Sequence, residues 1–385
     1  MRSKVAELGL GLALAAASLG LVFSVLELGL RLVYGGADPY QVSKIVQYDG
    51  QLGWSLVPGE YEFFNVASFT SARFSIGELG LRSKARPKAQ HRRITVFGDS
   101  FVFSEALSDG EVFTDLLQAR LGPQLEIVNA GVPGFGTGQQ ALLADRLRSS
   151  GFDLGEKVLL VFFTNDISDN AGLKYGSPER DPVKPAFEVR GEVLTGSPVE
   201  PWPRREHAVS MTALARNSIA YALIRNRLEI VVAKNPWLLR ALAGAGVSIP
   251  LPREPGLIHA WYAPAWQARW QRTEAILRHF ARSLRAEGRE LIVVFMPAPF
   301  QVEKVFEELI RSRTENPLNV EFLADIDRPQ RFLRNFCAAE RVRFVDLTPA
   351  LRERRAAPAY FLREGHLNAL GSAIVANTLH EAVSD

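Results

Sequence analysis

Cysteine is almost absent from this sequence: Cys337 is the only one among 385 residues. One cysteine cannot form an internal disulfide, and because no local motif surrounds it, we expect a small buried side chain there instead of a nucleophile. The sequence also lacks a His-Glu-x-x-His pair and a cysteine cluster, so we expect no metal and no cofactor. The net charge is only +3 and the pI about 9.0, too mildly basic to indicate nucleic-acid binding.

Charged residues are missing from one stretch near the N-terminus. None lies between Glu7 and Glu27, and at 1.5 Å per residue this apolar run spans roughly 28 Å, about one hydrocarbon core. We therefore expect residues 1–36 to form a single-pass anchor in the cell membrane. Arg2 and Lys4 favour a cytoplasmic N-terminus, which makes the main domain extracytoplasmic. A cleaved signal peptide and a buried helix of a soluble protein are the alternatives; the first would have a shorter apolar core, and the uncharged length argues against the second.

Residues 37–93 have the pattern of a connector packed on the main domain. Aromatic and polar residues alternate from Tyr61 to Phe74, which predicts one or two hairpins. Basic residues recur from Arg82 to Arg93, and such a run is typical of a solvated linker; contact with anionic lipid or an acidic polymer is the alternative.

The rest of the sequence alternates between strands and helices, which predicts a parallel α/β sheet with right-handed crossovers. We expect residues 94–385 to form this domain, with an insertion at about 170–260 that breaks the alternation and could cap the site. Inside the insertion we expect a hairpin-like segment at 187–194 and a helix near 210–232. The expected strands are residues 94–97, 125–129, 158–163, 291–296 and 343–347, and the clearest helices are residues 139–148, a helix that carries Trp266 and ends at Gly288, and a last helix from about Ala369.

Ligands of such sheets bind beyond the carboxyl ends of the strands, and three polar segments lie there. Ser100 follows the first strand, in Phe97-Gly98-Asp99-Ser100, where Gly98 permits a tight turn. Residues 131–138 follow the second strand, and Asn165 follows the third. We expect all three segments to face the same rim, where a serine in this position is a candidate nucleophile.

A serine nucleophile needs a base, and the base needs an orienting acid. Five of the six histidines lie in expected helices, in the basic run or in the insertion. His366 differs because it lies in a loop just before the last helix, for which Asn368 is a plausible N-cap. Glu364, two residues earlier, could accept a hydrogen bond from the imidazole; a solvated loop acid is the alternative.

Acyl transfer also needs donors for the developing oxyanion. The backbone amides of Ser100 and Gly134 and the side-chain amide of Asn165 are the candidates. An asparagine after a strand is also a common turn former, and the glycine run 134–138 resembles a dinucleotide loop. The dinucleotide interpretation is disfavoured because no acid is properly spaced to hold a ribose.

Taken together, these segments resemble the SGNH (GDSL-type) hydrolase family, including a subgroup with an N-terminal membrane helix. The resemblance implies a flavodoxin-like three-layer α/β/α sandwich with a five-stranded parallel sheet. It implies Ser100 as nucleophile, Gly134 and Asn165 as oxyanion donors and His366 as base, without a metal. Many members carry aspartate three residues before the histidine, where this sequence has Arg363. Others carry it two residues before, which gives the acid's role to Glu364; Asp346, after the last strand, is the alternative acid.

The sequence therefore predicts a membrane-anchored serine esterase that acts on O-acyl esters. Anchored or exported relatives act on acetyl groups of polysaccharides, so the resemblance implies O-acetyl esters of a carbohydrate as substrate. Two alternatives stay open: an O-acyltransferase that uses the same residues, and a non-catalytic binding module of an envelope assembly. The sequence indicates no particular protein partner.

Overall fold

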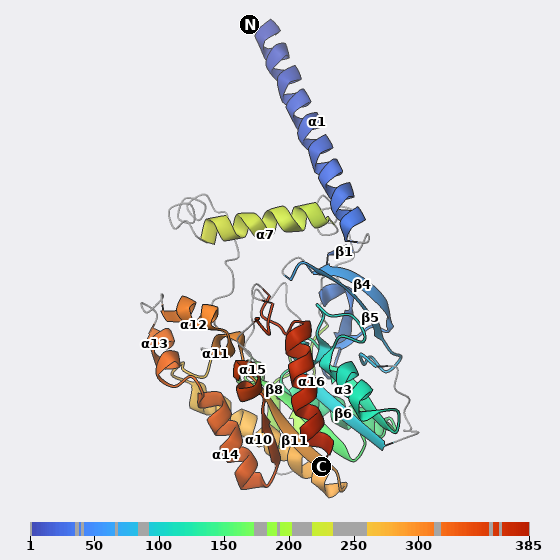
Figure 1. Ribbon diagram of the computed structural model, residues 1–385, viewed down its shortest axis with the longest axis vertical. Coiled ribbons are helices and arrows are strands. Elements are labelled where there is room, and N and C mark those ends of the chain that lie inside the picture. The colour runs from blue at the N-terminus through green and yellow to red at the C-terminus, as the bar shows by residue number, and fades with distance from the viewer. Residues whose placement is uncertain are drawn as a thin grey trace. The chain divides into compact units, whose positions relative to one another are not determined.

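Five buried apolar runs form one parallel sheet in the computed structural model of the protein (Figure 1). Residues 158–163 of the central strand are almost fully buried, so both faces of the sheet are covered. The strands are β6 (Arg92–Gly98), β7 (Leu125–Gly131), β8 (Lys157–Phe163), β11 (Glu290–Met296) and β12 (Arg343–Asp346).

The structure describes residues 2–34, 38–39, 42–65, 68–83, 92–172, 183–190, 193–201, 218–233, 260–311, 317–353, 357–361 and 364–384.

The order of the strands across the sheet is β7-β6-β8-β11-β12, and every pairing is parallel. When the strands are numbered in chain order, this is 2-1-3-4-5, the flavodoxin-like order. The second strand lies on one side of the first and the later strands lie on the other, so the order of the strands changes direction between β6 and β8. Val96 pairs with Leu159 and Phe97 with Leu160, so β6 and β8 end at about the same level. The segments that follow them, which begin at Ser100 and Thr164, thus meet at the topological switch point. The predicted fold class is confirmed.

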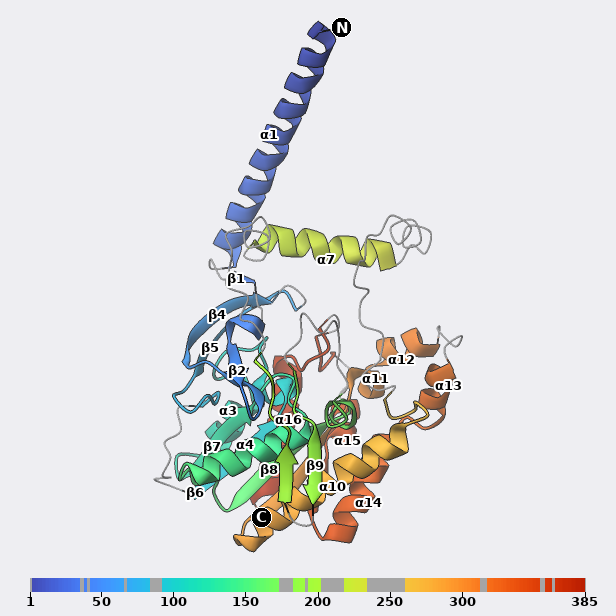
Figure 2. The same ribbon diagram turned by 180° about the vertical axis from the view of Figure 1, so that it is seen from behind.

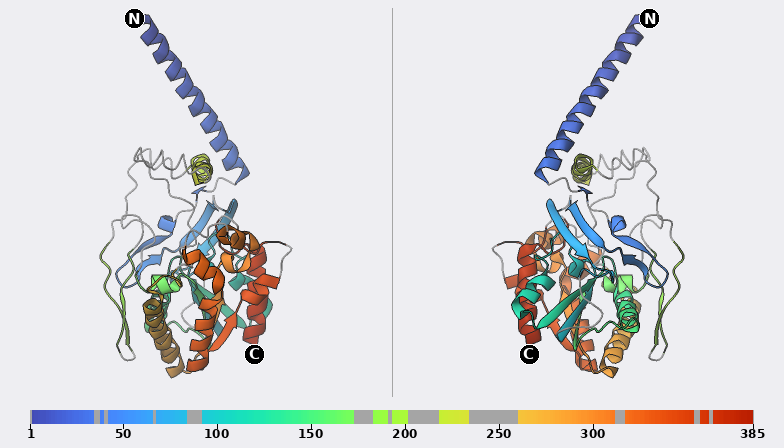
Figure 3. Two further views of the ribbon diagram at one scale, coloured as in Figure 1. Left: turned by 90° about the vertical axis from the view of Figure 1, so that its left-hand side faces the viewer. Right: turned by 90° about the vertical axis from the view of Figure 1, so that its right-hand side faces the viewer.

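Helices cover both faces of the sheet (Figures 1 and 3). On one face α3 packs against α16, and on the other α10 packs against α4 and α14. The helices of this domain are α2 (Ser100–Phe103), α3 (Phe113–Leu121), α4 (Thr137–Ser149), α5 (Asp166–Asp169), α10 (Trp266–Ala286), α11 (Pro299–Val302), α12 (Lys304–Arg311), α13 (Pro317–Ala324), α14 (Arg328–Glu340), α15 (Thr348–Glu353) and α16 (Ala369–Ser384).

Smaller strand pairs lie outside the main sheet. The predicted hairpin of the insertion is confirmed as the antiparallel pair β9 (Phe187–Arg190) and β10 (Val193–Gly196), which lies against α4 and α10 (Figure 2). The connector contains the pair β2 (Val46–Asp49) and β3 (Gly53–Leu56), the short helix η1 (Val42–Lys44), and a three-stranded sheet of β1 (Asp38–Pro39), β4 (Gly59–Asn65) and β5 (Thr70–Ile76).

The N-terminal apolar run forms a single long helix, α1 (Arg2–Val33). Its segment Gly9–Val33 has a mean hydropathy of 2.1, and none of its most apolar stretch is buried. The helix is therefore long and apolar enough to cross a membrane, a property that an anchor shares with a signal peptide.

The chain divides into two compact units. Helix α7 (Ile219–Ala233), which lies within the predicted helix near 210–232, belongs with α1 in the first unit; residues 210–217 are outside the described part. The parallel sheet and its helices form the second. The first unit is Met1–Tyr40, Glu62–Ala72 and Arg205–Glu254, and the second is Gln41–Tyr61, Arg73–Arg204 and Pro255–Asp385.

The expectation of a solvated basic linker is wrong for Arg82 and Arg93, whereas Arg92 is exposed as expected. Arg82 is 4% exposed and donates to the backbone carbonyls of Phe103, Ser104 and Leu107. Arg93 is 1% exposed and pairs with Glu126. These guanidinium groups are buried because carbonyl and carboxylate acceptors satisfy them; residues 84–91 lie outside the described part.

Candidate active site

Ser100 begins the short helix α2, directly beyond the end of β6. The turn needs glycine at position 98, because a Cβ there would lie 2.2 Å from Cγ2 of Val102. The side chain of Asp99 caps the helix by accepting from the backbone N–H of Phe101 at 2.9 Å. The serine is thus held on a buried, sterically fixed turn, the usual placement of a nucleophile in an α/β hydrolase.

The end of the neighbouring strand β7 supports this turn. Asn129 donates to the carbonyl of Val102 at 2.8 Å and accepts from Gly131 N–H at 3.0 Å. Three residues after Gly131, Gly134 has a φ of +79°, and a Cβ there would lie 3.3 Å from the Trp54 ring. The glycine therefore keeps an unusual backbone conformation that a side chain would strain.

His366 reaches the site from the other end of the chain, on the loop between α15 and α16. The loop turns back on itself: Phe361 N–H donates to the carbonyl of His366 at 2.8 Å, and Tyr360 bridges to Leu367. Gly365, just before the histidine, has a φ of +89°. This turn presents the imidazole to the rim of the sheet.

The imidazole joins the two residues that the sequence assigns to it. Its Nε2 lies 2.7 Å from Ser100 Oγ, and its Nδ1 lies 2.5 Å from Glu364 Oε1. Ser100 and His366 are 266 positions apart in the sequence, so this contact depends on the fold. A hydroxyl, an imidazole and a carboxylate in hydrogen-bonding series form the geometry of a nucleophile, its base and an orienting acid.

A second carboxylate, that of Glu105, lies close to this series. The ligand atoms of Glu105, Glu364 and His366 are all within 4.8 Å of one another, and Glu105 is buried. Burial, reinforced by the Glu364 charge and opposed by His366, raises the pKa of Glu105 to about 7. For His366 burial acts in the opposite direction, but the charges of Glu364, Glu105 and Asp99 outweigh it and raise the pKa of the imidazole.

Asn165 lies across the switch point from the serine turn. Its side-chain amide donates to Asp99 Oδ2 at 3.3 Å, and its Oδ1 is buried. Asp99 is itself fully buried, and that burial raises its pKa. The amide group of Asn165 therefore points toward the residue next to Ser100.

The same cluster could offer three ligand atoms to a metal ion: Glu105, Glu364 and His366. A metal, however, would have to take one of the imidazole nitrogens, and these already contact Ser100 and Glu364. The donor set therefore fits a proton-transfer series better than a metal centre.

The comparison with protein families decides the class of the domain. Residues 259–385, which contain His366 and Glu364, match the family model described as "SGNH hydrolase-like domain, acetyltransferase AlgX". This part of the chain belongs to an SGNH hydrolase-like domain. The resemblance predicted from the sequence is thereby confirmed.

Several solved structures are similar to the chain. One is TesA, with 13% sequence identity and a TM-score of 0.38; the match covers 76% of this chain and 98% of TesA. Another is a GDSL-family lipolytic protein from Veillonella parvula, with 11% identity and a TM-score of 0.38; the match covers 76% of this chain and 98% of that protein. A catalytic mutant of Axe2, an acetylxylan esterase from Geobacillus stearothermophilus, matches at 10% identity over 77% of this chain and 95% of that one, with a TM-score of 0.38. Likeness at this level says nothing about substrate. No curated protein matches the chain by sequence.

The alternative acid of the SGNH hydrolase-like domain, Asp346, has other partners. Its carboxylate pairs with Arg334 at 3.1 Å and accepts from the backbone N–H of Thr348 at 2.9 Å. Arg363, where many relatives have aspartate, lies outside the described residues. Glu364 is thus the predicted acid that the structure brings to His366.

Sequence reasoning missed Glu105. It is the one charged residue between Ser100 and Leu107 in an otherwise apolar or small stretch, Phe101-Val102-Phe103-Ser104-Glu105-Ala106-Leu107. A lone carboxylate five residues after a nucleophile, in a segment that must be buried, is a signal that could have singled it out.

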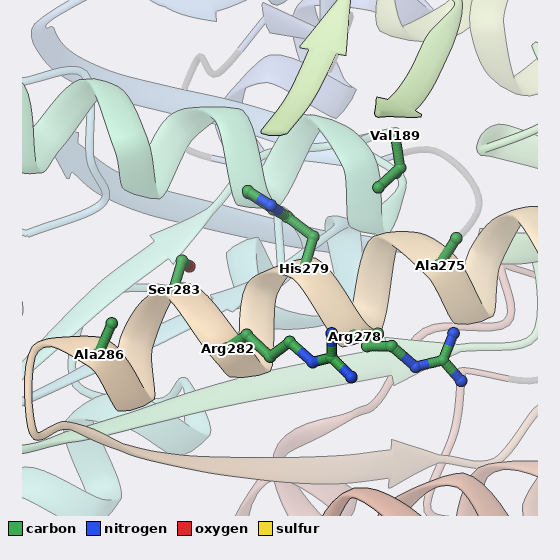
Figure 4. Close-up of a pocket in the computed structure, with 7 residues that line it drawn as sticks. All are labelled: Val189, Ala275, Arg278, His279, Arg282, Ser283 and Ala286. Atoms are coloured by element: carbon green, nitrogen blue, oxygen red, sulfur yellow. The ribbon is translucent and has the colours of Figure 1, made fainter. Parts of the chain in front are cut away.

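A separate hollow of about 240 Å³ lies on the outer face of the domain (Figure 4). It is lined mainly by α10, including His279, Arg278 and Arg282, with Val189 opposite. Both arginines pair with Glu340, so their charges are already used. None of the predicted site residues lines this hollow.

Proposed function

We propose that the protein is a serine-dependent O-acyl transfer enzyme in which Ser100 is the nucleophile, His366 the base and Glu364 the orienting acid. The observation that carries the proposal is the hydrogen-bonded series from Ser100 Oγ through the imidazole to the Glu364 carboxylate, at 2.7 and 2.5 Å. Groups so aligned can move a proton from the hydroxyl as the oxygen attacks.

The chemistry follows from these positions. Ser100 Oγ attacks the carbonyl carbon of an acyl ester while His366 Nε2 takes the hydroxyl proton. The tetrahedral intermediate then collapses: the bond to the alcohol breaks, and the imidazolium returns the proton to the departing oxygen. A second alcohol or water, deprotonated by His366, attacks the acyl-enzyme and frees Ser100. Glu364 holds the imidazole and stabilises its charged form.

The oxyanion of this intermediate needs donors near Ser100. We assign this role to the backbone N–H groups of Ser100 and Gly134 and to the side-chain amide of Asn165. The support is the open backbone at Gly134, with its φ of +79°, and the direction of the Asn165 amide toward Asp99. Such donors are worth several kcal/mol in the transition state.

The acceptor that we favour is a sugar hydroxyl, which makes the enzyme an O-acetyltransferase of a polysaccharide. The support is the family model, whose description names an acetyltransferase. Hydrolysis of carbohydrate O-acetyl esters, predicted first from the sequence, is the second candidate, because the same acyl-enzyme reacts with water when no acceptor is held.

We propose that residues 1–36 anchor the enzyme, with residues 37–93 as connector and 94–385 as an extracytoplasmic catalytic domain. The apolar length of α1 supports the anchor, and Arg2 and Lys4 before it support the orientation. This places the domain where envelope polysaccharides are modified.

The test is a two-product assay on the full chain in detergent. An activated acetate ester is supplied with and without a deacetylated polysaccharide, and both free acetate and polymer-bound acetyl are measured. Ser100→Ala is compared with Ser283→Ala, a serine on α10 outside the site. Acetylation of the polymer that requires Ser100 supports the transferase. Acetate release alone supports the esterase, and equal rates in Ser100→Ala and the parent would favour the binding module.

A further inference from the structure

Helix α7 (Ile219–Ala233) has one face that is packed. Ile219 is fully buried against Phe64 of β4, and Leu223, one turn later, joins the same apolar cluster. The guanidinium of Arg227 lies over the Phe69 ring, 5.5 Å from its centre. These contacts fix which side of α7 faces the rest of the first unit.

The opposite face of α7 is apolar and open. Tyr221, Ile224 and Leu228 are 41%, 41% and 56% exposed. With 100° of rotation per residue, these three side chains fall within an arc of about 60°, centred almost opposite Ile219 and Leu223. Exposed apolar residues that share one stripe of a helix indicate a surface made to be covered.

A carboxylate from α1 holds the start of α7. Glu27 accepts from Ser218 Oγ and from the backbone N–H of Ala220, both at 2.8 Å, and from Ile219 N–H at 3.3 Å. It therefore caps the helix, a role that favours a negative charge. Glu27 is also the first charged residue after the long uncharged run, so α7 begins at the level where the apolar length of α1 ends.

We propose that α7 is a second membrane element, an amphipathic helix that lies in the plane of the lipid–water interface with Tyr221, Ile224 and Leu228 in the lipid. The proposal rests on the anchor role given to α1 above. Figures 1 and 3 show α7 running crosswise to α1, with α1 leaving on the side away from β1. The exposed apolar face of α7 therefore points in the direction in which α1 extends, toward the bilayer.

The charges of α7 fit this occupant. Arg225 is exposed beside the apolar stripe, and a basic side chain in that position favours anionic headgroups. The partner is a lipid surface and not a second protein chain because Glu27, at the end of the apolar run of α1, is hydrogen-bonded to the start of α7. This contact sets the depth of α7 in the membrane. The helix fixes the first unit at a defined height on the membrane.

The experiment measures depth by spin labels in the full chain, reconstituted into vesicles of phosphatidylcholine and phosphatidylglycerol. Single cysteines replace Ile224 or Leu228 in a Cys337→Ala background, because Cys337 is the sole native thiol and is buried. Val193, exposed on β10, provides the water control, and Leu19 of α1 provides the lipid control. Collisions with oxygen and with a water-soluble nickel complex are compared at each position.

We expect oxygen-to-nickel collision ratios at 224 and 228 several-fold above that at 193, with depths of about 5–10 Å at the headgroup boundary. Ratios equal to that at 193 overturn the proposal, as do labels shielded from both reagents, which would mean a protein partner. A label at Leu19 that is not in lipid refutes the anchor alone, since lipid contact at 224 and 228 would still support an interfacial helix.

Discussion

The two sides of the candidate site are held by different forces. On the serine side, the ends of β6, β7 and β8 fix Ser100 through close packing and through hydrogen bonds of Asn129 and Asp99, with Gly98 filling a space too small for a Cβ. On the histidine side, a loop presents His366 and three carboxylates surround it: Glu364, Glu105 and Asp99. The serine side therefore sets positions, and the histidine side sets charge and proton affinity.

This contrast has a measurable form. Changes on the serine side should lower the rate by the same factor at every pH, because no titrating charge is altered. Changes on the histidine side should also move the pH at which the rate rises. The rate depends on neutral His366, whose pKa the carboxylates raise, so activity should increase as the pH rises through that pKa.

The largest effect is expected for Ser100→Ala, which removes the attacking oxygen. We expect kcat to fall by about 10⁴–10⁶, equally at all pH values, with an unchanged melting temperature. Steady-state rates and a thermal melt check this. A loss of less than about tenfold would show that Ser100 is not the nucleophile.

Glu364→Gln should have the next largest effect, on the histidine side. The amide cannot hold the imidazole in its charged form, so we expect kcat to fall by about 10²–10⁴. The pKa of His366 should fall as well, because its nearest negative charge is gone. A pH–rate profile tests both effects, with Asp346→Asn, next to Arg334 instead of His366, as the matched control.

Asn165→Ala should remove one oxyanion donor on the serine side. We expect a drop in kcat of about 10²–10³ with KM and the pH profile little changed. A lower melting temperature with an unchanged rate constant would instead indicate a structural turn residue.

Glu105→Gln should have the smallest effect on the maximal rate and a clear effect on the pH profile. Removing this carboxylate lowers the pKa of His366, so the acid limb should move to lower pH by about one unit, with the same plateau. The variant should therefore be faster than the parent at pH values above the pKa of Glu105, where this carboxylate is charged in the parent, and the two rates should converge below it. An unshifted limb would show that Glu105 does not act on the imidazole.

The sequence predicted the fold, and it singled out the candidate residues Ser100, Glu364 and His366 that the structure brings together, because both depend on short local signals. The five strands are compact apolar runs, Gly98 stands where a Cβ has no space, and Gly134 has a positive φ that other residues adopt rarely. Helix starts are marked less clearly: Ser108-Asp109-Gly110-Glu111 has the pattern of a capping box, and Glu111 does accept from Ser108 N–H, but α3 begins at Phe113 with Val112 as its N-cap. Local patterns locate a turn more reliably than they locate the first residue of a helix.

What the sequence could not reveal depends on contacts between distant segments. The burial of Arg82 requires three carbonyls that lie 21 to 25 residues further along the chain. The charge of Glu105 matters only because a loop more than 250 residues away brings His366 to it. The binding of α7 to Glu27 likewise spans more than 190 positions.

The hydrogen bonds of Arg82 to the segment that follows Ser100 have a practical consequence for truncated forms of this protein. A fragment that started at residue 92 would retain the whole parallel sheet but lose the guanidinium that satisfies the carbonyls of Phe103, Ser104 and Leu107. It would also lose the indole of Trp54, which donates to the carbonyl of Pro133 beside Gly134, the glycine proposed as an oxyanion donor. The smallest piece worth expressing therefore starts upstream of residue 42, and shorter ones should give insoluble or inactive material.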